Sequence, residues 1–187
     1  MQTLRPQHGF GLMEVLVALL VLAIGLLGTI ALQTRAMQME LESYQRVQAL
    51  NLLDDMASRL AANRANRGCY RLENEIPPYV GVGSPVVETM LANNTHPDCV
   101  ADIAAWDQLL RGASVEEAGG NMVGAMIGAR GCIEQLAPRE YLISIAWQGM
   151  QATSANVDFT CAQGLYGGDD AMRRVVARTV EFADLGF

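Results

Sequence analysis

One uninterrupted apolar run near the N-terminus constrains this chain more than any other feature of its sequence. The run extends from Phe10 to Leu32, and its one ionisable residue is Glu14. At about 1.5 Å per residue, a helix of this length crosses a hydrocarbon core of about 30 Å. A secretory signal has an apolar region of roughly 7–15 residues, followed by a small-residue cleavage site. Here the run is longer and a suitable cleavage site precedes it, so we expect a membrane-spanning helix.

Glu14 is the exception within this apolar run. A carboxylate near the end of a spanning segment costs a few kcal/mol and usually marks a function. The alternative is a glutamate that sits at the level of the lipid headgroups. Physical chemistry alone leaves both interpretations open.

The residues around the start of the run resemble the class III signal of type IV prepilins: Gly9, Phe10 and, four positions later, Glu14. The resemblance implies that a prepilin peptidase cleaves after Gly9 and N-methylates Phe10. It also implies that Glu14 pairs with the N-terminal amine of a neighbouring subunit. Opposite charges attract strongly in a low-dielectric helix bundle, whereas either charge alone is costly there. The implied domains are a leader (1–9), a transmembrane and assembly helix (10–32) and a periplasmic globular domain (33–187).

The resemblance extends to the minor pilins called PilV, or type IV pilus modification proteins. It is carried by residues 14–28, Trp106, Cys132 and the segments 146–149 and 173–176. It implies a minor pilin that helps initiate pilus assembly and form the tip complex, with a role in surface piliation, adhesion and twitching motility. The alternative is a pseudopilin of a type II secretion system, which shares the N-terminal signal and the general fold.

Partners and location follow from the same resemblance. The implied partners are the other minor and major pilins, the prepilin peptidase, the inner membrane and a tip adhesin. The implied location is the bacterial inner membrane, crossed once, with the domain in the periplasm, and the pilus after assembly. A single-span anchored periplasmic enzyme is a third possibility, but Glu14 and the Gly9–Phe10 junction argue against it.

The helical period continues beyond the apolar run. Apolar side chains recur every three or four positions: Met37, Leu41, Tyr44, Val47, Leu50, Leu53, Met56 and Leu60. This stripe predicts an amphipathic helix that either joins a coiled coil or packs on its own domain. Because the stripe runs directly into the folded region, we favour packing on the domain, with the helix ending near Gly68.

The rest of the chain predicts short helices followed by a sheet. Helices are expected at 86–91, at 100–110 with Asp98 as the N-terminal cap, and after the capping box at 114–117. Trp106 is expected to be a core anchor. Strands are expected at 131–136, 141–147, 156–161 and 174–182. A long helix, with a transmembrane half and an amphipathic half, packed on a small antiparallel sheet is an α+β architecture, and it is the pilin fold that the resemblance implies.

The four cysteines are Cys69, Cys99, Cys132 and Cys161. An even number of well-separated cysteines outside the cytoplasm indicates two disulfides, and three pairings are possible. We favour Cys69–Cys99 and Cys132–Cys161, because each would join a loop-rich segment to a nearby element. Four buried free thiols are the alternative.

The composition argues against several other functions. The net charge is −7 and all 13 basic residues are arginines, so nucleic acid is not an expected partner. Only His96 would remain after loss of the leader, so we expect no metal, no cofactor and no catalytic site. The pair Asp169–Asp170 could bind a cation, but a solvated turn explains it more simply.

Overall fold

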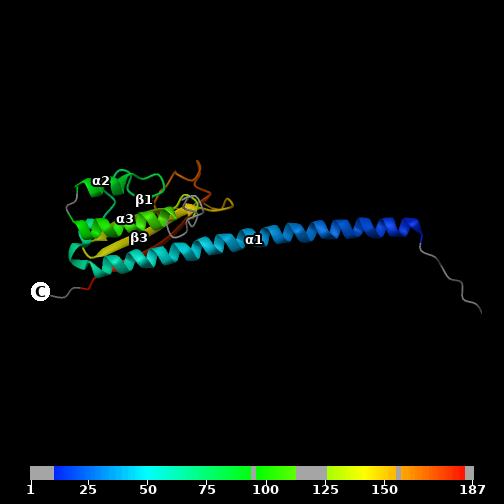
Figure 1. Ribbon diagram of the computed structural model, residues 1–187, viewed down its shortest axis with the longest axis horizontal. Coiled ribbons are helices and arrows are strands. Elements are labelled where there is room, and N and C mark those ends of the chain that lie inside the picture. Colours follow the sequence, from blue (N-terminus) through cyan, green and yellow to red (C-terminus); the bar gives the residue numbers. More distant parts are fainter. Residues whose placement is uncertain (1–10, 94–95, 113–125, 155–156, 184–187) are drawn as a thin grey trace, which may run out of the picture. The chain divides into compact units, whose positions relative to one another are not determined.

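The computed structural model describes residues 11–93, 96–112, 126–154 and 157–183 (Figure 1). It divides into two compact units, an N-terminal unit up to Leu41 and a C-terminal unit from Glu42 onward. The elements in chain order are α1 (Leu12–Ala62), η1 (Arg64–Tyr70), β1 (Val80–Gly81), α2 (Val86–Asn93), α3 (Pro97–Arg111), β2 (Arg130–Ala137), β3 (Glu140–Gln148) and β4 (Arg173–Glu181).

The first element, α1, is a continuous helix of 51 residues. It is long because no proline interrupts this part of the chain. Within the N-terminal unit its apolar side chains are exposed, and one 18-residue window reaches a mean hydropathy of 2.9. By length and composition the helix can cross a membrane, although a signal sequence would pass the same test.

The C-terminal unit is built on a four-stranded antiparallel sheet in the order β1-β2-β3-β4. The expected strands at 131–136, 141–147 and 174–182 are confirmed with small shifts at their ends. The short β1 was not expected from sequence, because two residues carry no periodic signal. Gly81 in β1 has a φ of 105°, and a Cβ there would lie 2.4 Å from the carbonyl oxygen of Ala129.

One face of this sheet forms the main core together with α1 and α3. It contributes Ile133, Ile143, Ile145, Trp147 and Val176, while the helices contribute Leu53, Met56, Leu60, Ile103, Trp106 and Leu110. The fold is therefore the α+β, pilin-like arrangement expected from the sequence: a long N-terminal helix packed on a small antiparallel sheet. Figure 1 shows α3 and the later part of α1 close to β3.

Trp106 is the anchor of this core, as expected. Its side chain is fully buried, and its indole N–H donates to the carbonyl of Leu52 on α1 at 3.0 Å. A Cβ on Gly131 of β2 would lie 2.3 Å from the indole ring. The strand therefore requires glycine at that position, where the indole ring of Trp106 packs against it.

The apolar stripe of α1 packs on the domain as expected, but it is buried only near the end of the helix. Leu53, Met56 and Leu60 are buried, but the five earlier members are exposed: Met37, Leu41, Tyr44, Val47 and Leu50. Ala49 and Ala57 complete the buried face instead. Small side chains stand out poorly in a pattern of large apolar residues, which is why this part of the buried face was missed from the sequence.

Three other expectations about helix ends and strands need correction. Helix α3 begins at Pro97 with His96 as its N-cap, not with Asp98, because proline suits the first helical position, whose N–H has no partner in the helix. Helix α1 ends at Ala62, and Gly68 lies within the following 3₁₀ helix η1. The expected strand at 156–161 is wrong for its described part, since residues 157–161 are irregular. The capping box at 114–117 lies outside the described residues.

Candidate functional site

The N-terminal end of α1 carries Glu14, the residue for which the resemblance to type IV prepilins implies a role in assembly. Glu14 lies in the first turn of the helix, and its backbone N–H donates to the carbonyl of Gly11 at 3.0 Å. Its side chain is exposed and lies beside Val15, Ala18, Leu19 and Leu22 along a shallow groove of about 320 Å³. Gly9 and Phe10 lie outside the described residues.

The apolar part of α1 satisfies its polar side chains within the helix. The hydroxyl of Thr29 donates to the carbonyl of Leu26 at 2.8 Å, and that of Thr34 donates to Ile30 at 3.1 Å. Such internal bonds matter in lipid, which offers no water as a partner. A Cβ on Gly25 or Gly28 would meet nothing within 4 Å, so both glycines leave open space on the helix surface. Small residues of this kind allow neighbouring helices to approach closely in a membrane.

The C-terminal unit holds α1 at Glu42. One carboxylate oxygen of Glu42 accepts the backbone N–H groups of Met150 at 2.9 Å and Gln151 at 3.3 Å. The same oxygen lies 3.2 Å from the guanidinium of Arg174 on β4. Three donors converge on one carboxylate, so the segment that follows β3 is fixed to the helix. A second ion pair, Asp54 with Arg178 of β4, joins the two elements further along.

The end of α1, η1 and α3 meet in a polar network around Asp102. The hydroxyl of Tyr70 donates to Asp102 at 2.5 Å, and Arg59 pairs with the other oxygen of Asp102 at 3.1 Å and with Asp55 at 2.8 Å. Burial, followed by the hydrogen bond to Asp102, raises the pKa of the Tyr70 hydroxyl. The bond to Asp55 contributes most to raising the pKa of Arg59. Tyr70 therefore stays a neutral donor at ordinary pH.

Two disulfides join the cysteines in the pairing favoured from the sequence. Cys69 of η1 is bonded to Cys99 of α3, with 6.4 Å between their Cα atoms. Cys132 of β2 is bonded to Cys161, with a Cα–Cα distance of 5.8 Å. The first bridge supports the helical side of the core. The second fixes the irregular segment that follows β3 to the opposite face of the sheet.

That opposite face is organised by two arginines. The guanidinium of Arg130 lies between the rings of Tyr79 and Tyr166, at 5.4 Å and 5.0 Å from their centroids. Burial raises the pKa of the Tyr166 hydroxyl. The buried Arg173 donates to the carbonyls of Phe159 and Cys161 at 2.7 Å and 3.2 Å. These carbonyls point at a side chain rather than at a neighbouring strand, which explains why no strand forms before Cys161.

Asp170 departs from the solvated turn expected for the pair Asp169–Asp170. It is buried, accepts the backbone N–H of Gly164 at 2.8 Å and pairs with Arg173 at 3.3 Å. Its role is therefore structural, because both of its oxygens are used within the protein. Asp169 instead accepts the backbone N–H of Ala171 at 3.1 Å.

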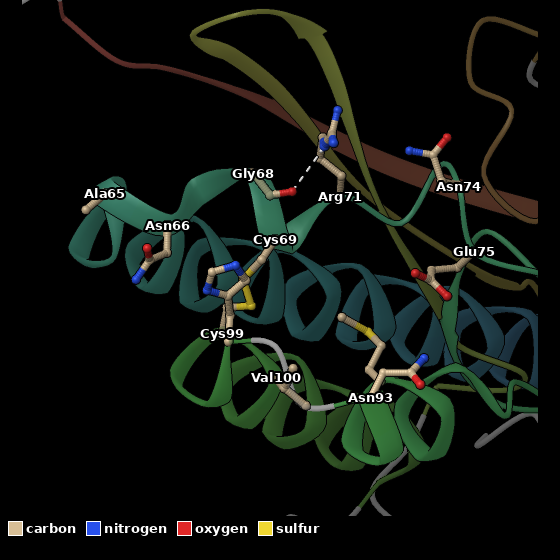
Figure 2. Close-up of a pocket in the computed structure, with 12 residues that line it drawn as sticks. Ala65, Asn66, Gly68, Cys69, Arg71, Asn74, Glu75, Asn93, Cys99 and Val100 are labelled. Carbon is tan, nitrogen blue, oxygen red and sulfur yellow. Dashed lines mark hydrogen bonds between the residues drawn. A yellow bond between two sulfur atoms is a disulfide. The ribbon is translucent and has the colours of Figure 1, made fainter.

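A pocket of about 630 Å³ opens beside the first disulfide (Figure 2). It is lined by Ala65, Asn66, Gly68, Cys69, Arg71, Asn74, Glu75, Met90, Asn93, His96, Cys99 and Val100. His96 is an exposed residue here. Within the described ranges, no group of three or more His, Cys, Asp or Glu side chains is placed to hold a metal ion.

Several residues that organise the C-terminal unit were missed from the sequence, above all Glu42, Arg130 and the adjacent pair Arg173–Arg174. One signal was available. In a strand, consecutive side chains point to opposite faces, so an Arg-Arg pair must place one guanidinium on each face of the sheet. Their acidic partners could not be found this way, because Glu42 and Arg174 are 132 residues apart in the chain.

Two family models match adjacent parts of the chain. The model of the prokaryotic N-terminal methylation motif matches residues 4–30. The model described as type IV pilin Tt1218 matches residues 31–79, which contain the later part of α1, η1 and Cys69. No curated protein and no solved structure shows significant similarity to the chain.

The two matches distinguish the apolar helix from an ordinary signal sequence. The methylation motif covers the junction at Gly9 and the helix that carries Glu14, and it implies processing by a prepilin peptidase. The pilin match continues without a break into the region that packs on the sheet, and it implies assembly with other pilins. Together with the α+β fold and the apolar N-terminal helix, these matches identify the chain as a type IV pilin-like precursor.

Proposed function

We propose that this protein is a minor pilin of the type IV pilus, which helps to initiate assembly and forms part of the tip complex. The observation that carries the proposal is the exposed apolar segment of α1 with Glu14 in its first turn, within the matched methylation motif. The similarity of Trp106, Cys132 and the strand segments 146–149 and 173–176 to PilV-type minor pilins supports the finer assignment. A role in surface piliation, adhesion and twitching motility, with a tip adhesin as a partner, belongs to the same proposal.

The proposed processing divides the chain at the Gly9–Phe10 bond. Residues 1–9 are the leader, Phe10 becomes the methylated N-terminus, and residues 10–32 span the bacterial inner membrane. Residues 33–187 form the periplasmic domain, which becomes part of the pilus on assembly. The two disulfides support an oxidising compartment for this domain.

Glu14 is proposed to attract the amine of Phe10 on an adjacent subunit during insertion into the fibre. A buried carboxylate and a buried amine are each costly in lipid, so their pairing favours one register of neighbouring helices. Phe10 and Glu14 are also one helical turn apart in the same chain, so a pair within one subunit is the competing arrangement. The exposed position of Glu14 supports the intersubunit pair, because its carboxylate is open to a neighbour.

The proposed role is that of an assembly protein and not of an enzyme. The pilin family is structural. The one histidine of the mature chain, His96, is exposed at the start of α3. A pseudopilin of a type II secretion system is the second candidate, and the N-terminal methylation motif favours it as much as a pilin.

Deletion of the gene tests the proposal against this second candidate. We expect a deletion strain to assemble far fewer surface pili, counted by electron microscopy, and to regain them when the gene is supplied in trans. Secretion of type II substrates into the medium should be unchanged. Normal piliation with a secretion defect would instead identify a pseudopilin, and normal piliation with normal secretion would contradict both assignments.

A further inference from the structure

The two disulfides differ sharply in their surroundings. Cys132 and Cys161 are each 2% exposed and pack against Ala146, Ala162 and Tyr166. Cys69 is only partly buried, and the Cys69–Cys99 bridge forms part of the wall of the open 630 Å³ pocket (Figure 2). Cys99 itself is fully buried. A reagent in solution can therefore reach the first bridge, and it reaches it from the side of Cys69.

Loop length does not separate the two bridges. Their cysteines are 30 and 29 residues apart, so each bridge restricts the unfolded chain to nearly the same extent. Thiol–disulfide exchange proceeds by attack of a thiolate on one sulfur, and its rate depends on access to that sulfur and on the stability of the departing thiolate. These two factors decide which bridge reacts.

The pocket offers an attacking thiolate both room and a positive charge. Arg71 lines the pocket two residues after Cys69. Its guanidinium is held by the carbonyl of Gly68 at 3.1 Å and by the side chain of Gln135 at 3.3 Å, and it lies 3.8 Å from the carboxylate of Glu73. Figure 2 shows Arg71 and Gly68 beside Cys69, joined by the first of these bonds. A nearby cation favours the approach of a thiolate. Glu75 also lines the pocket, with the opposite charge.

The position of Cys99 favours its sulfur as the leaving group of the exchange. It is the third residue of the 15-residue helix α3, where the unbonded N–H groups of the first turn favour a negative charge. Two carboxylates flank it along the helix. Asp98 opposes the effect, whereas Asp102 is already bound to Arg59 and Tyr70. A thiolate that these N–H groups stabilise departs faster in exchange, so attack at Cys69 with departure of Cys99 is the favoured direction.

We propose that the Cys69–Cys99 bridge is a thiol–disulfide exchange site, attacked at Cys69 by an external dithiol. The dithiol's thiolate forms a bond to the sulfur of Cys69, the Cys69–Cys99 bond breaks, and Cys99 leaves as a thiolate that takes a proton from water. The reagent's second thiol then attacks the reagent's first sulfur, which is bonded to Cys69 in the mixed disulfide. This step closes the reagent's own disulfide and releases Cys69 as a thiol. The bridge gains two electrons and the dithiol is oxidised to a disulfide.

Exchange at this site leaves the domain folded. Reduction frees η1 from the start of α3, but Tyr70 and Arg59 still bind Asp102 and keep the same elements together. The buried Cys132–Cys161 bridge stays closed. The singly reduced protein is therefore a defined species in which only the region around the pocket is loosened.

The direct test uses the full membrane-extracted protein in detergent, with dithiothreitol as the dithiol. Samples are quenched over time by alkylation, then unfolded, and each cysteine is mapped by mass spectrometry. We expect Cys69 and Cys99 to become alkylated at least about tenfold faster than Cys132 and Cys161. Equal rates, or faster reduction of the second bridge, would overturn the proposal. With glutathione and acid quenching, the adduct should lie on Cys69, and an adduct on Cys99 would refute the proposed direction of attack.

A pair of glycine variants tests whether the reducing reagent reaches Cys69 through the pocket. Gly68 lines the pocket, Gly168 does not, and a Cβ at either position would meet nothing within 4 Å. Neither glycine has a positive φ, so both positions accept a side chain. Gly68→Trp should slow reduction of Cys69–Cys99 by about tenfold by filling the approach to Cys69, whereas Gly168→Trp should leave the rate unchanged. Equal rates in the two variants would show that the pocket does not control access.

Discussion

Glu42 and Arg174 meet at 3.2 Å although 132 residues separate them in the chain. The same oxygen of Glu42 also accepts the backbone N–H groups of Met150 and Gln151. One helix residue thus fixes both an edge strand of the sheet and the segment that leaves β3. Glu42 is the first residue of the C-terminal unit. The contact with Arg174 therefore lies at the position on α1 where this unit begins.

Glu42→Ala should destabilise the C-terminal unit by about 1–2 kcal/mol. The substitution leaves two backbone N–H groups and a guanidinium without their acceptor, and partial exposure of the site to water limits the cost. Thermal unfolding measures the loss, and amide hydrogen exchange should quicken at Met150 and Gln151. Glu40→Ala, at an exposed position two residues earlier on the same helix, is the control and should change neither quantity. Unchanged exchange at the two amides in Glu42→Ala would contradict this account.

The Tyr70–Asp102 bond predicts how stability depends on alkaline pH. Because burial and Asp102 raise the pKa of Tyr70, the folded protein keeps this phenol protonated at a pH where the unfolded chain, with a pKa of about 10, has lost the proton. The stabilisation is therefore complete below about pH 10 and is lost as the pH rises towards the folded pKa. Urea unfolding across this range should show the decline.

Tyr70→Phe isolates this contribution. The variant should lose about 1 kcal/mol near neutral pH, because Asp102 loses a donor, and its stability should fall less steeply above about pH 10. Tyr44→Phe is the control, since Tyr44 is 68% exposed and should behave as the wild type. An alkaline decline that is equally steep in Tyr70→Phe would show that Tyr70 does not cause it.

The sequence predicted the parts of the fold that carry a strong periodic signal. The apolar run predicted the helix α1, and the alternation that places Ile143 and Ile145 on one face predicted the strand β3. It missed part of the buried face of α1, because Ala49 and Ala57 belong to this face and small residues stand out poorly in an apolar pattern.

Long-range polar contacts were beyond sequence reasoning. The clusters around Glu42, Asp102 and Arg173 join residues from distant segments, and nothing local distinguishes such charges from a solvated surface. The disulfide pairing was accessible because four cysteines allow only three pairings. The difference in exposure between the two bridges required the structure.

Glu14→Ala should separate processing from assembly. In cells that lack the native copy, we expect the variant to be cleaved and inserted into the membrane, but to support few surface pili and to co-purify poorly with other minor pilins. The reason is that the variant lacks the carboxylate that we propose to pair with a neighbour's amine. Glu40→Ala, an exposed glutamate on the same helix, should assemble normally. Normal piliation and co-purification of Glu14→Ala would rule out the intersubunit pair.

The chemical state of the N-terminus shows whether the chain is processed as a type IV prepilin. Mass spectrometry of the protein extracted from membranes should show loss of residues 1–9 and one added methyl group on Phe10. Gly9 is the smallest residue and leaves room for the peptidase at the cut, so Gly9→Leu should accumulate as the uncut precursor, whereas Gly11→Leu, in open space two residues later, should still be cut. A mature chain that begins beyond Leu32 would contradict the assignment as a type IV pilin-like precursor.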